Sequence, residues 1–261
     1  MVKQLSIEGK TALVLGASKG IGLACANKLA ECGATVVMAA RSLERLESAV
    51  QCIREQGGKA IATQCDVASY RSVESAVQSA LKQTGRLDIV VNNAGVIEPL
   101  TSLAESDPQE WSRAVDVNVK GVYHGMRAAL PSMLEAGSGV IVNMSSGAAN
   151  SALLGWSHYC STKAAVKKLT EVAHVELQHK NIRVVGLSPG TVATDMMAAI
   201  RDAKINVVSE LDWASHIPPE WVGEAVAFLC GPEGQAYAGT DFSIKTKEGR
   251  QAVGLPFHGA A

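Results

Sequence analysis

Residues 11–22 read Thr-Ala-Leu-Val-Leu-Gly-Ala-Ser-Lys-Gly-Ile-Gly, an apolar run that passes into a glycine-rich turn. The run Thr11–Leu15 predicts a buried strand, and Gly16, Gly20 and Gly22 stand between it and a helical pattern. Glycine permits a tight turn and a close approach of the backbone to a ligand. The N-terminus of the following helix offers free N–H groups to an anion. The stretch therefore predicts a site for the pyrophosphate of a dinucleotide; the alternative is a turn whose glycines serve packing alone.

Further apolar, β-branched runs recur along the chain, each followed by a segment long enough for a helix. They predict strands at Thr11–Leu15, Thr35–Ala39, Ala60–Gln64, Asp88–Asn92, Val140–Met144, Ile182–Leu187 and Thr240–Ile244. Helical patterns fill Gly20–Gly33, Leu43–Gln56, Ser69–Gln83, Pro108–Leu134, Ser157–His179 and Pro219–Leu229. Strands this apolar are typical of a parallel sheet that helices cover on both faces. The alternation predicts a doubly wound α/β fold.

No break in composition and no Pro- or Ser-rich linker divides the chain, so we expect one domain over residues 1–261. The stretch Asp195–Ile217 interrupts the alternation of strands and helices, and it is a candidate lid over a binding site. Residues 250–261 form a C-terminal tail that fits no pattern.

The composition excludes several classes of protein. The 261 residues are 47% hydrophobic and 19% charged, which argues against intrinsic disorder, collagen and coiled coils. Lys plus Arg is 24 and Asp plus Glu is 25, for a net charge of −1. Because no large basic surface is expected, nucleic acid is not a predicted partner.

The six cysteines form no C-x-x-C pair, and we expect reduced thiols rather than disulfides. The first ten residues contain no apolar signal core. No run approaches the ~18 apolar residues of a membrane span. The sequence therefore predicts a cytoplasmic protein that does not enter the membrane.

Two cations flank the predicted anion site. Lys19 lies at the start of a predicted helix, where a cation opposes the helix dipole unless an anion is bound. The second strand ends at Ala40-Arg41, whereas an NAD site usually has an acid there for the ribose 2′-hydroxyl. A guanidinium can hold a 2′-phosphate with two hydrogen bonds. We therefore predict NADP(H) over NAD(H); the alternative is that both cations are merely solvated.

A second group of residues indicates acid–base chemistry. Tyr159 and Lys163 are four residues apart, on one face of a predicted helix. A nearby cation stabilises phenolate and lowers the pKa of a tyrosine from about 10. Ser146 ends the fifth predicted strand, thirteen residues before Tyr159, with Ser145 as the neighbouring alternative. Asn118 interrupts an apolar helical pattern and must find hydrogen-bond partners if it is buried.

Together these residues closely resemble the short-chain dehydrogenase/reductase family in its single-domain form, from about Gly9 to Thr240. The matching motifs are G-A-S-K-G-I-G at 16–22, Asp66-Val67, N-N-A-G at 92–95, Asn118, Ser146, Y-x-x-x-K at 159–163 and P-G-T-V-A-T at 189–194. The resemblance implies a Rossmann fold with seven parallel strands in the order 3-2-1-4-5-6-7. It also implies hydride transfer between a nicotinamide cofactor and a small carbonyl or alcohol substrate.

The resemblance further implies roles for individual residues. Tyr159 would be the acid in carbonyl reduction and the base in alcohol oxidation, and Ser146 would hold the substrate oxygen. Lys163 would bind the nicotinamide ribose and lower the pKa of Tyr159, and Asn118 would anchor a water that connects Lys163 to solvent. The implied cofactor contacts are Gly16, Ser18, Lys19, Gly20, Ile21, Gly22, Arg41, Asp66, Val67, Asn93, Ala94, Gly95, Tyr159, Lys163, Pro189, Gly190, Val192 and Thr194.

The chain departs from the family pattern in two places. Leu15 stands where the family usually has Thr, and Gly239–Gly249 lacks the usual V-D-G-G ending. The last predicted helix begins at Pro219 and has an apolar face. In the family, this helix and the last strand form a subunit interface. The resemblance therefore implies a homotetramer, with a dimer as the second possibility.

Three functional classes remain open: an NADP(H)-dependent carbonyl reductase, 3-oxoacyl reductase or alcohol dehydrogenase; a non-catalytic NADP(H) sensor; and a lyase or epimerase that uses the nicotinamide transiently. The intact Ser146, Tyr159 and Lys163 favour the first. Substrates could be 3-oxoacyl thioesters, small or cyclic ketones, sugars or steroids. Candidates for the pocket wall are Trp156, Met196, Met197 and Trp213.

Overall fold

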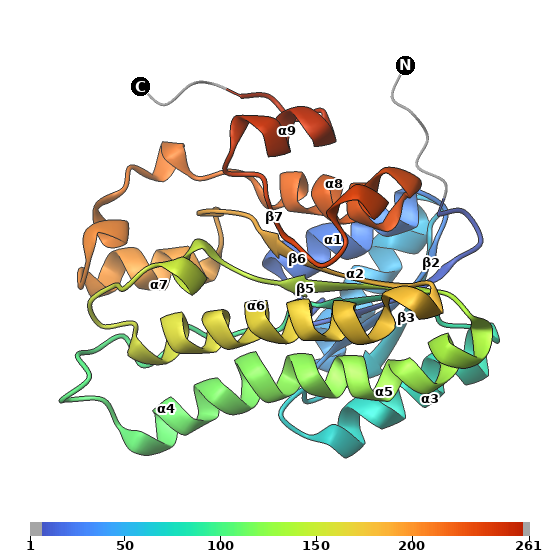
Figure 1. The fold of residues 1–261 in the computed structure, drawn as a ribbon, viewed down its shortest axis with the longest axis horizontal. Helices are drawn as coiled ribbons and strands as arrows, with labels where there is room; N and C mark the ends of the chain where they lie inside the picture. The colour runs from blue at the N-terminus through green and yellow to red at the C-terminus, as the bar shows by residue number, and fades with distance from the viewer. Residues whose placement is uncertain (1–6, 258–261) are drawn as a thin grey trace.

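The computed structural model describes residues 7–257. Within them, parallel strands form one sheet in the order β3-β2-β1-β4-β5-β6-β7, with helices on both faces (Figure 1). The strands are β1 (Thr11–Leu15), β2 (Thr35–Ala40), β3 (Lys59–Gln64), β4 (Ile89–Asn92), β5 (Gly139–Met144), β6 (Ile182–Ser188) and β7 (Asp241–Ser243). The predicted doubly wound α/β fold and strand order are confirmed, and every strand end lies within one residue of its predicted position.

The central strands are apolar because both faces of the sheet are covered. Every residue of β1 and β4 is buried, and Leu13 of β1 pairs with Val37 of β2 on one side and Val90 of β4 on the other. The strand order reverses between β1 and β4, and ligands of open parallel sheets bind in the crevice beyond the carboxyl ends at such a reversal.

The helices fall into two layers around the sheet. They are α1 (Gly20–Glu31), α2 (Leu43–Glu55), α3 (Tyr70–Thr84), α4 (Pro108–Val115), α5 (Gly121–Ala136), α6 (Ser157–Leu177), α7 (Asp195–Ala203), α8 (Pro219–Cys230) and α9 (Lys247–Val253). One apolar cluster joins the sheet to α1, α2 and α8, and a second joins it to α3, α5 and α6. Figure 1 shows α4, α5 and α6 on one side of the sheet and α1, α8 and α9 on the other.

Local sequence explains where several helices begin and end. The Asp107 carboxylate accepts hydrogen bonds from the N–H groups of Gln109 and Glu110, both at 2.9 Å, and Pro108 occupies the first helical position. Gly85 and Gly137 end α3 and α5 in the left-handed conformation that glycine adopts readily.

The segment predicted as one helix over Pro108–Leu134 is divided. A π-helical turn, η1 (Asp116–Lys120), joins α4 to α5, and Asn118 lies within it. A π-turn inserts an extra residue into the helix, and such turns are frequent at functional sites. The apolar periodicity predicted helical structure in this segment correctly, but it gave no indication of the π-turn.

The candidate lid, residues 195–217, follows β6, and its last residue, Ile217, lies beside the residues that precede its first. It contains α7 and two short turns, η4 (Val207–Glu210) and η5 (Trp213–Ser215). Hydrogen bonds tie its two ends together: the Ala193 N–H donates to the Ile217 carbonyl at 2.9 Å, and the Ile217 N–H donates to the Thr191 carbonyl at 3.1 Å. The segment is therefore closed at its base.

The C-terminal part is more ordered than the sequence suggested. Strand β7 pairs in parallel with β6, and α9 follows it, with the Thr246 hydroxyl capping its first turn. Ala252, Val253 and Leu255 pack against the core cluster. The predicted tail is thus partly folded, and residues 258–261 lie outside the described residues. Among residues 7–257, no helix combines the length and the hydropathy that a membrane crossing needs.

The buried carboxylate of Asp88 forms hydrogen bonds at the edge of the sheet opposite the crevice. Asp88 accepts hydrogen bonds from the Thr11 N–H at 2.8 Å and from the Arg86 guanidinium at 2.7 and 2.5 Å. Burial pushes its pKa upward, but Arg86, the Thr11 N–H and Lys10 together hold the pKa of this carboxyl below its ordinary value.

We expect Asp88→Asn to lower the free energy of unfolding at neutral pH by about 1–3 kcal/mol, because charge-assisted hydrogen bonds are lost. A lowered pKa contributes stability above the unfolded value of about 3.9, and this is lost as the pH falls through the folded value. Urea unfolding should therefore show the difference at neutral pH and a smaller one in acid. Asp202→Asn, which alters an exposed pair with Arg201, should leave stability unchanged; an equal loss in both variants would contradict this account.

Candidate active site

A cleft of about 1370 Å³ lies at the carboxyl ends of the strands. The predicted residues that line it are Gly16, Ser18, Lys19, Gly20, Ile21, Arg41, Asp66, Val67, Asn93, Ala94, Gly95, Ser146, Tyr159, Lys163, Pro189, Gly190, Val192 and Thr194. Two predicted residues, Gly22 and Asn118, are buried behind this lining. The structure therefore brings together the groups that the sequence placed more than 170 residues apart.

The glycine loop is shaped by close backbone contacts. Gly16 and Gly20 have φ angles of +80° and +54°. A Cβ atom on Gly22 would lie 2.1 Å from the Gly16 carbonyl oxygen and 2.6 Å from Nδ2 of Asn93. Gly22 thus serves packing, whereas Gly16 and Gly20 shape the turn. The N-terminus of α1 has no side-chain cap at Lys19, so its first N–H groups suit a phosphate.

Three cations line the cleft beside this loop: Lys19, Arg41 and Arg45. The strand β2 ends at Ala40 and offers no carboxylate there. Lys19 is not merely solvated, as its Nζ lies 2.7 Å from Oδ2 of Asp195 at the start of α7. The ammonium has three N–H donors, so this contact leaves donors free for a phosphate.

Sequence reasoning missed Arg45, although a signal existed. Ser42 caps α2 and its hydroxyl accepts the Arg45 N–H, so Arg45 lies in the first turn of the helix. A cation there opposes the helix dipole, which is the argument that singled out Lys19. Two further cations line the cleft: Lys245, from the segment Gly239–Gly249 that departs from the family pattern, and Arg250, the first residue of the predicted tail.

The three residues of the predicted reaction come from two neighbouring elements. Ser146 follows β5 and caps a short turn, η2 (Gly147–Asn150), its hydroxyl accepting the Ala148 N–H at 3.2 Å. Tyr159 lies in the first turn of α6, and Lys163 lies one turn later. The Lys163 ammonium donates to the Met144 carbonyl at 2.7 Å and lies 5.6 Å from the centroid of the Tyr159 ring.

Burial dominates the protonation of this pair. It raises the pKa of Tyr159 to about 12, although the Ser146 hydroxyl opposes the shift. It lowers the pKa of Lys163 to about 8, although the Asp241 carboxylate opposes that shift. The expectation of a lowered tyrosine pKa is therefore wrong for this structure, because the phenol is buried and the effect of burial exceeds that of the Ser146 hydroxyl. At neutral pH the phenol keeps its proton.

Asn118 is fully buried, and both its amide oxygen and its amide nitrogen are hydrogen-bonded to the protein. Its Oδ1 accepts the Val96 N–H at 2.8 Å, and its Nδ2 donates to the Val96 carbonyl at 3.0 Å and to Oγ1 of Thr162 at 3.2 Å. The side chain thus joins the π-turn to the loop after β4 and to α6. The expected water anchor remains a prediction, and holding this loop is the role that the geometry shows.

The far part of the cleft is mostly apolar. Its wall includes Leu153, Trp156, Met196, Met197, Ile200, Val208, Leu211 and Ile217. Trp213, a further candidate, lies outside the lining and is 40% exposed, with the Arg201 guanidinium 5.1 Å from its ring. His158 is buried, and its Nε2 lies 2.7 Å from the Ile97 carbonyl, so it does not line the cleft either.

The sequence model of the short chain dehydrogenases matches residues 10–205. The 3-oxoacyl-[acyl-carrier-protein] reductase FabG of Staphylococcus aureus is 36% identical over 237 residues, which cover 90% of this chain and 96% of the relative.

Two solved structures show the same fold with different cofactors. NAD⁺-bound xylitol dehydrogenase is 28% identical, with a TM-score of 0.85 over 92% of this chain and 98% of that one. A variant of actinorhodin polyketide ketoreductase with NADPH is 30% identical, with a TM-score of 0.85 over 94% of this chain and 97% of that one. The chain belongs to the short-chain dehydrogenase/reductase family, whose members are oxidoreductases that use nicotinamide cofactors on C=O and CH–OH groups.

Proposed function

We propose that this chain is an NADP(H)-dependent carbonyl reductase or alcohol dehydrogenase. The observation that carries the proposal is one cleft with Ser146, Tyr159 and Lys163 on its wall and three cations beside its glycine loop. A non-catalytic NADP(H) sensor is the alternative, but a sensor has no need of a buried phenol next to a buried ammonium.

The cleft fits a nicotinamide dinucleotide phosphate. The uncapped N-terminus of α1 suits the pyrophosphate. Lys19, Arg41 and Arg45 suit the 2′-phosphate, and β2 ends without the acid that would favour NAD(H). Because the two solved relatives carry NAD⁺ and NADPH, family membership alone does not select the cofactor, and these side chains carry the choice.

The other predicted contacts follow the length of the cleft. Asp66 and Val67 would bind the adenine, Asn93, Ala94 and Gly95 the ribose and backbone, and Val192 and Thr194 the carboxamide. Asp66 is held in a tight turn, since its Oδ1 accepts the Ala68 N–H at 3.0 Å. Pro189 and Gly190 line the cleft beside these last contacts.

The bound nicotinamide would give or take the hydride. In reduction the protonated Tyr159 donates its phenolic proton to the substrate oxygen, and in oxidation the phenolate takes that proton back. The Ser146 hydroxyl donates a hydrogen bond to the same oxygen. The Lys163 ammonium stabilises the phenolate that reduction leaves behind, since it lies 5.6 Å from the ring centroid.

The apolar wall favours ketones with apolar substituents over sugars, because hydroxyl groups would be buried there without partners. A second candidate is a 3-oxoacyl thioester, which Lys245 and Arg250 would favour by attracting an acidic carrier. Arg127 and Arg201 do not line the cleft. NADPH oxidation with cyclohexanone, a 3-oxoacyl thioester and a ketose distinguishes these classes.

We also propose one domain over residues 1–261, with residues 195–217 as a lid, and a cytoplasmic homotetramer, with a dimer as the second possibility. The α8 side chains assigned to the subunit interface are buried within the chain: Val222, Ala225, Val226 and Leu229 are fully covered. Exposed apolar side chains lie instead on α5 and α6, at Tyr123, Leu134, Val172 and Val175. Light scattering that shows only monomer would refute the oligomer.

Tyr159→Phe should lower kcat for carbonyl reduction by at least about 100-fold, because the proton donor is lost. NADPH affinity should change less than about twofold, since no charged cofactor contact is removed. Steady-state kinetics and fluorescence titration measure the two quantities. Tyr123→Phe, at an exposed position on α5, is the matched control and should behave as the native protein; substantial turnover by Tyr159→Phe would refute the assigned role.

Arg41→Asp should lower the ratio of kcat/KM for NADPH to that for NADH by about 10- to 100-fold. A charge-assisted hydrogen bond contributes about 1.5–3 kcal/mol, and a carboxylate would repel the phosphate. The ratio is measured with both cofactors and one ketone. Arg71→Asp, an equal charge change on the exposed side of α3 and outside the cleft, should leave the ratio unaltered. An unchanged ratio in Arg41→Asp would overturn the assignment of NADP(H).

A further inference from the structure

A half-buried carboxylate, that of Asp241, lies beside the catalytic wall and is not among the residues that line the cleft. Asp241 is the first residue of β7 and pairs with Gly186 of β6. A Cβ atom on Gly186 would come within 2.8 Å of Oδ1 of Asp241. The glycine therefore leaves the space that this carboxylate occupies, between the last two strands and α6.

The hydrogen bonds of Asp241 lead directly to the active site. Its Oδ2 accepts the Ser145 hydroxyl at 3.1 Å. Ser145 is buried, and it stands between Met144, whose carbonyl binds the Lys163 ammonium, and Ser146, the proposed substrate contact. The other carboxylate oxygen of Asp241, Oδ1, is buried and has no hydrogen-bond partner among residues 7–257. An unpaired buried carboxylate oxygen is costly unless a positive charge lies near it.

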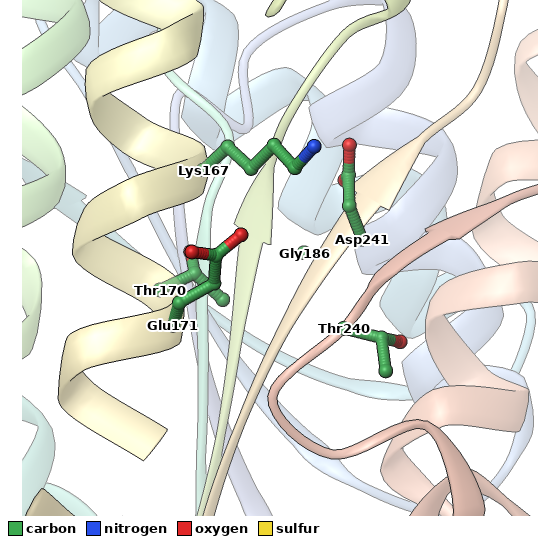
Figure 2. A pocket seen from close by; sticks show the side chains of 6 residues that line it. All are labelled: Lys167, Thr170, Glu171, Gly186, Thr240 and Asp241. Atoms are coloured by element: carbon green, nitrogen blue, oxygen red, sulfur yellow. The ribbon is translucent and has the colours of Figure 1, made fainter. Parts of the chain in front are cut away.

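Helix α6 supplies the positive charges. Tyr159, Lys163, Lys167 and Glu171 are each four residues apart, so they form one stripe along the helix. Lys167, Thr170 and Glu171 line a small pocket together with Gly186, Thr240 and Asp241. Figure 2 shows the Lys167 amine and the Asp241 carboxyl group directed toward one another across it. Lys167 is held there by Asn150, whose Oδ1 accepts its hydrogen bond at 2.7 Å.

Burial and one nearby carboxylate have opposite effects on the pKa of Lys163. Tyr159 and Lys167 lie one helical turn from Lys163 on α6, the Met144 carbonyl accepts its hydrogen bond, Asn118 Oδ1 lies near it beside Gly95, and Asp241 of β7 acts on it electrostatically. Burial lowers the pKa of Lys163, and Asp241 is the charge that opposes it. Burial likewise raises the pKa of Asp241; the Ser145 hydroxyl, Lys167 and Lys163 oppose that shift, and Glu171 adds to it.

We propose that Asp241 is a positioning residue of the active site: its carboxylate keeps Lys163 in the ammonium form and, through Ser145, fixes the turn that presents Ser146. The proposal rests on the proposed function, because it assumes the roles given to Lys163 and Ser146. Asp241 faces the small pocket beside α6 and does not line the cleft. It therefore offsets the cost of burying Lys163 without occupying space in the cleft.

The charge of Lys163 can be measured without a substrate. The lysine Cε–Hε signals of the full chain are titrated by nuclear magnetic resonance, and the Lys163 signal is the one absent from Lys163→Met. We expect a midpoint of about 8 in the native protein, and one lower by about one pH unit in Asp241→Asn. Glu171→Gln removes a carboxylate from the same pocket, away from Ser145, and should not lower the midpoint. An unchanged midpoint in Asp241→Asn overturns the electrostatic role. If that variant does not fold, Asp241→Ser decides the same question.

The effect on catalysis is read from alcohol oxidation. Between the two Lys163 midpoints, at about pH 7–8, only the native protein carries the ammonium that stabilises phenolate, so Asp241→Asn should lower kcat most strongly in this range. Ser145→Ala keeps both charges and should lower kcat by about tenfold at every pH, with KM for NADP⁺ unchanged. A native kcat in Ser145→Ala overturns the positioning of Ser146. Absence of turnover by the native protein on every alcohol would count against the proposed function, while the titration still decides the role of Asp241.

Discussion

Strands buried on both faces can be polar only at their ends, and this constraint organises the whole molecule. The side chains of β1 and β4 are all covered, so the chain places its hydrogen-bonding and charged groups where strands stop. At the carboxyl edge the strands lead into Gly16, Arg41, Asn93, Ser146 and Pro189, all of which line one cleft. At the opposite edge, Asp88 gathers Thr11 and Arg86. The binding site is thus a consequence of how a parallel sheet solvates its ends.

The same burial that builds the sheet sets the chemistry of the site. Removing a phenol and an ammonium from water favours their neutral forms, and both Tyr159 and Lys163 shift in that direction. A neutral phenol is the form that donates a proton, but a neutral amine could not stabilise the phenolate that remains. The role proposed for Lys163 therefore needs a source of negative charge near its ammonium that does not touch Tyr159. Asp241, on the far side of β6, meets this requirement.

Much of this arrangement could be predicted from the sequence, because it depends on local patterns. Apolar runs predicted every strand end to within one residue, glycine and tyrosine–lysine spacing indicated the loop and the catalytic pair, and the family resemblance implied most of the other cleft residues. What could not be predicted depends on contacts between distant segments. The π-turn at Asn118 and the meeting of Asp241 with Ser145 leave no periodic trace. The sign of the Tyr159 pKa shift depended on how deeply the ring is buried, and spacing on one helix carries no such information. Likewise, the apolar face of α8 fits a subunit interface or a core equally well, and only packing against α1 shows that it is core.

An exposed ion pair between Lys19 and Asp195 connects two parts of the cleft lining. It joins the glycine loop to the first turn of α7, where the carboxylate also favours the helix dipole. Both side chains are more than half exposed, and exposed pairs contribute only about 0–1 kcal/mol. Asp195 lies in the first turn of α7, whose Met196, Met197 and Ile200 form part of the apolar wall. An ammonium has three N–H donors, so Lys19 has donors left for an anion beside the glycine loop. A single exposed ion pair therefore joins the glycine loop to the element that carries the apolar wall.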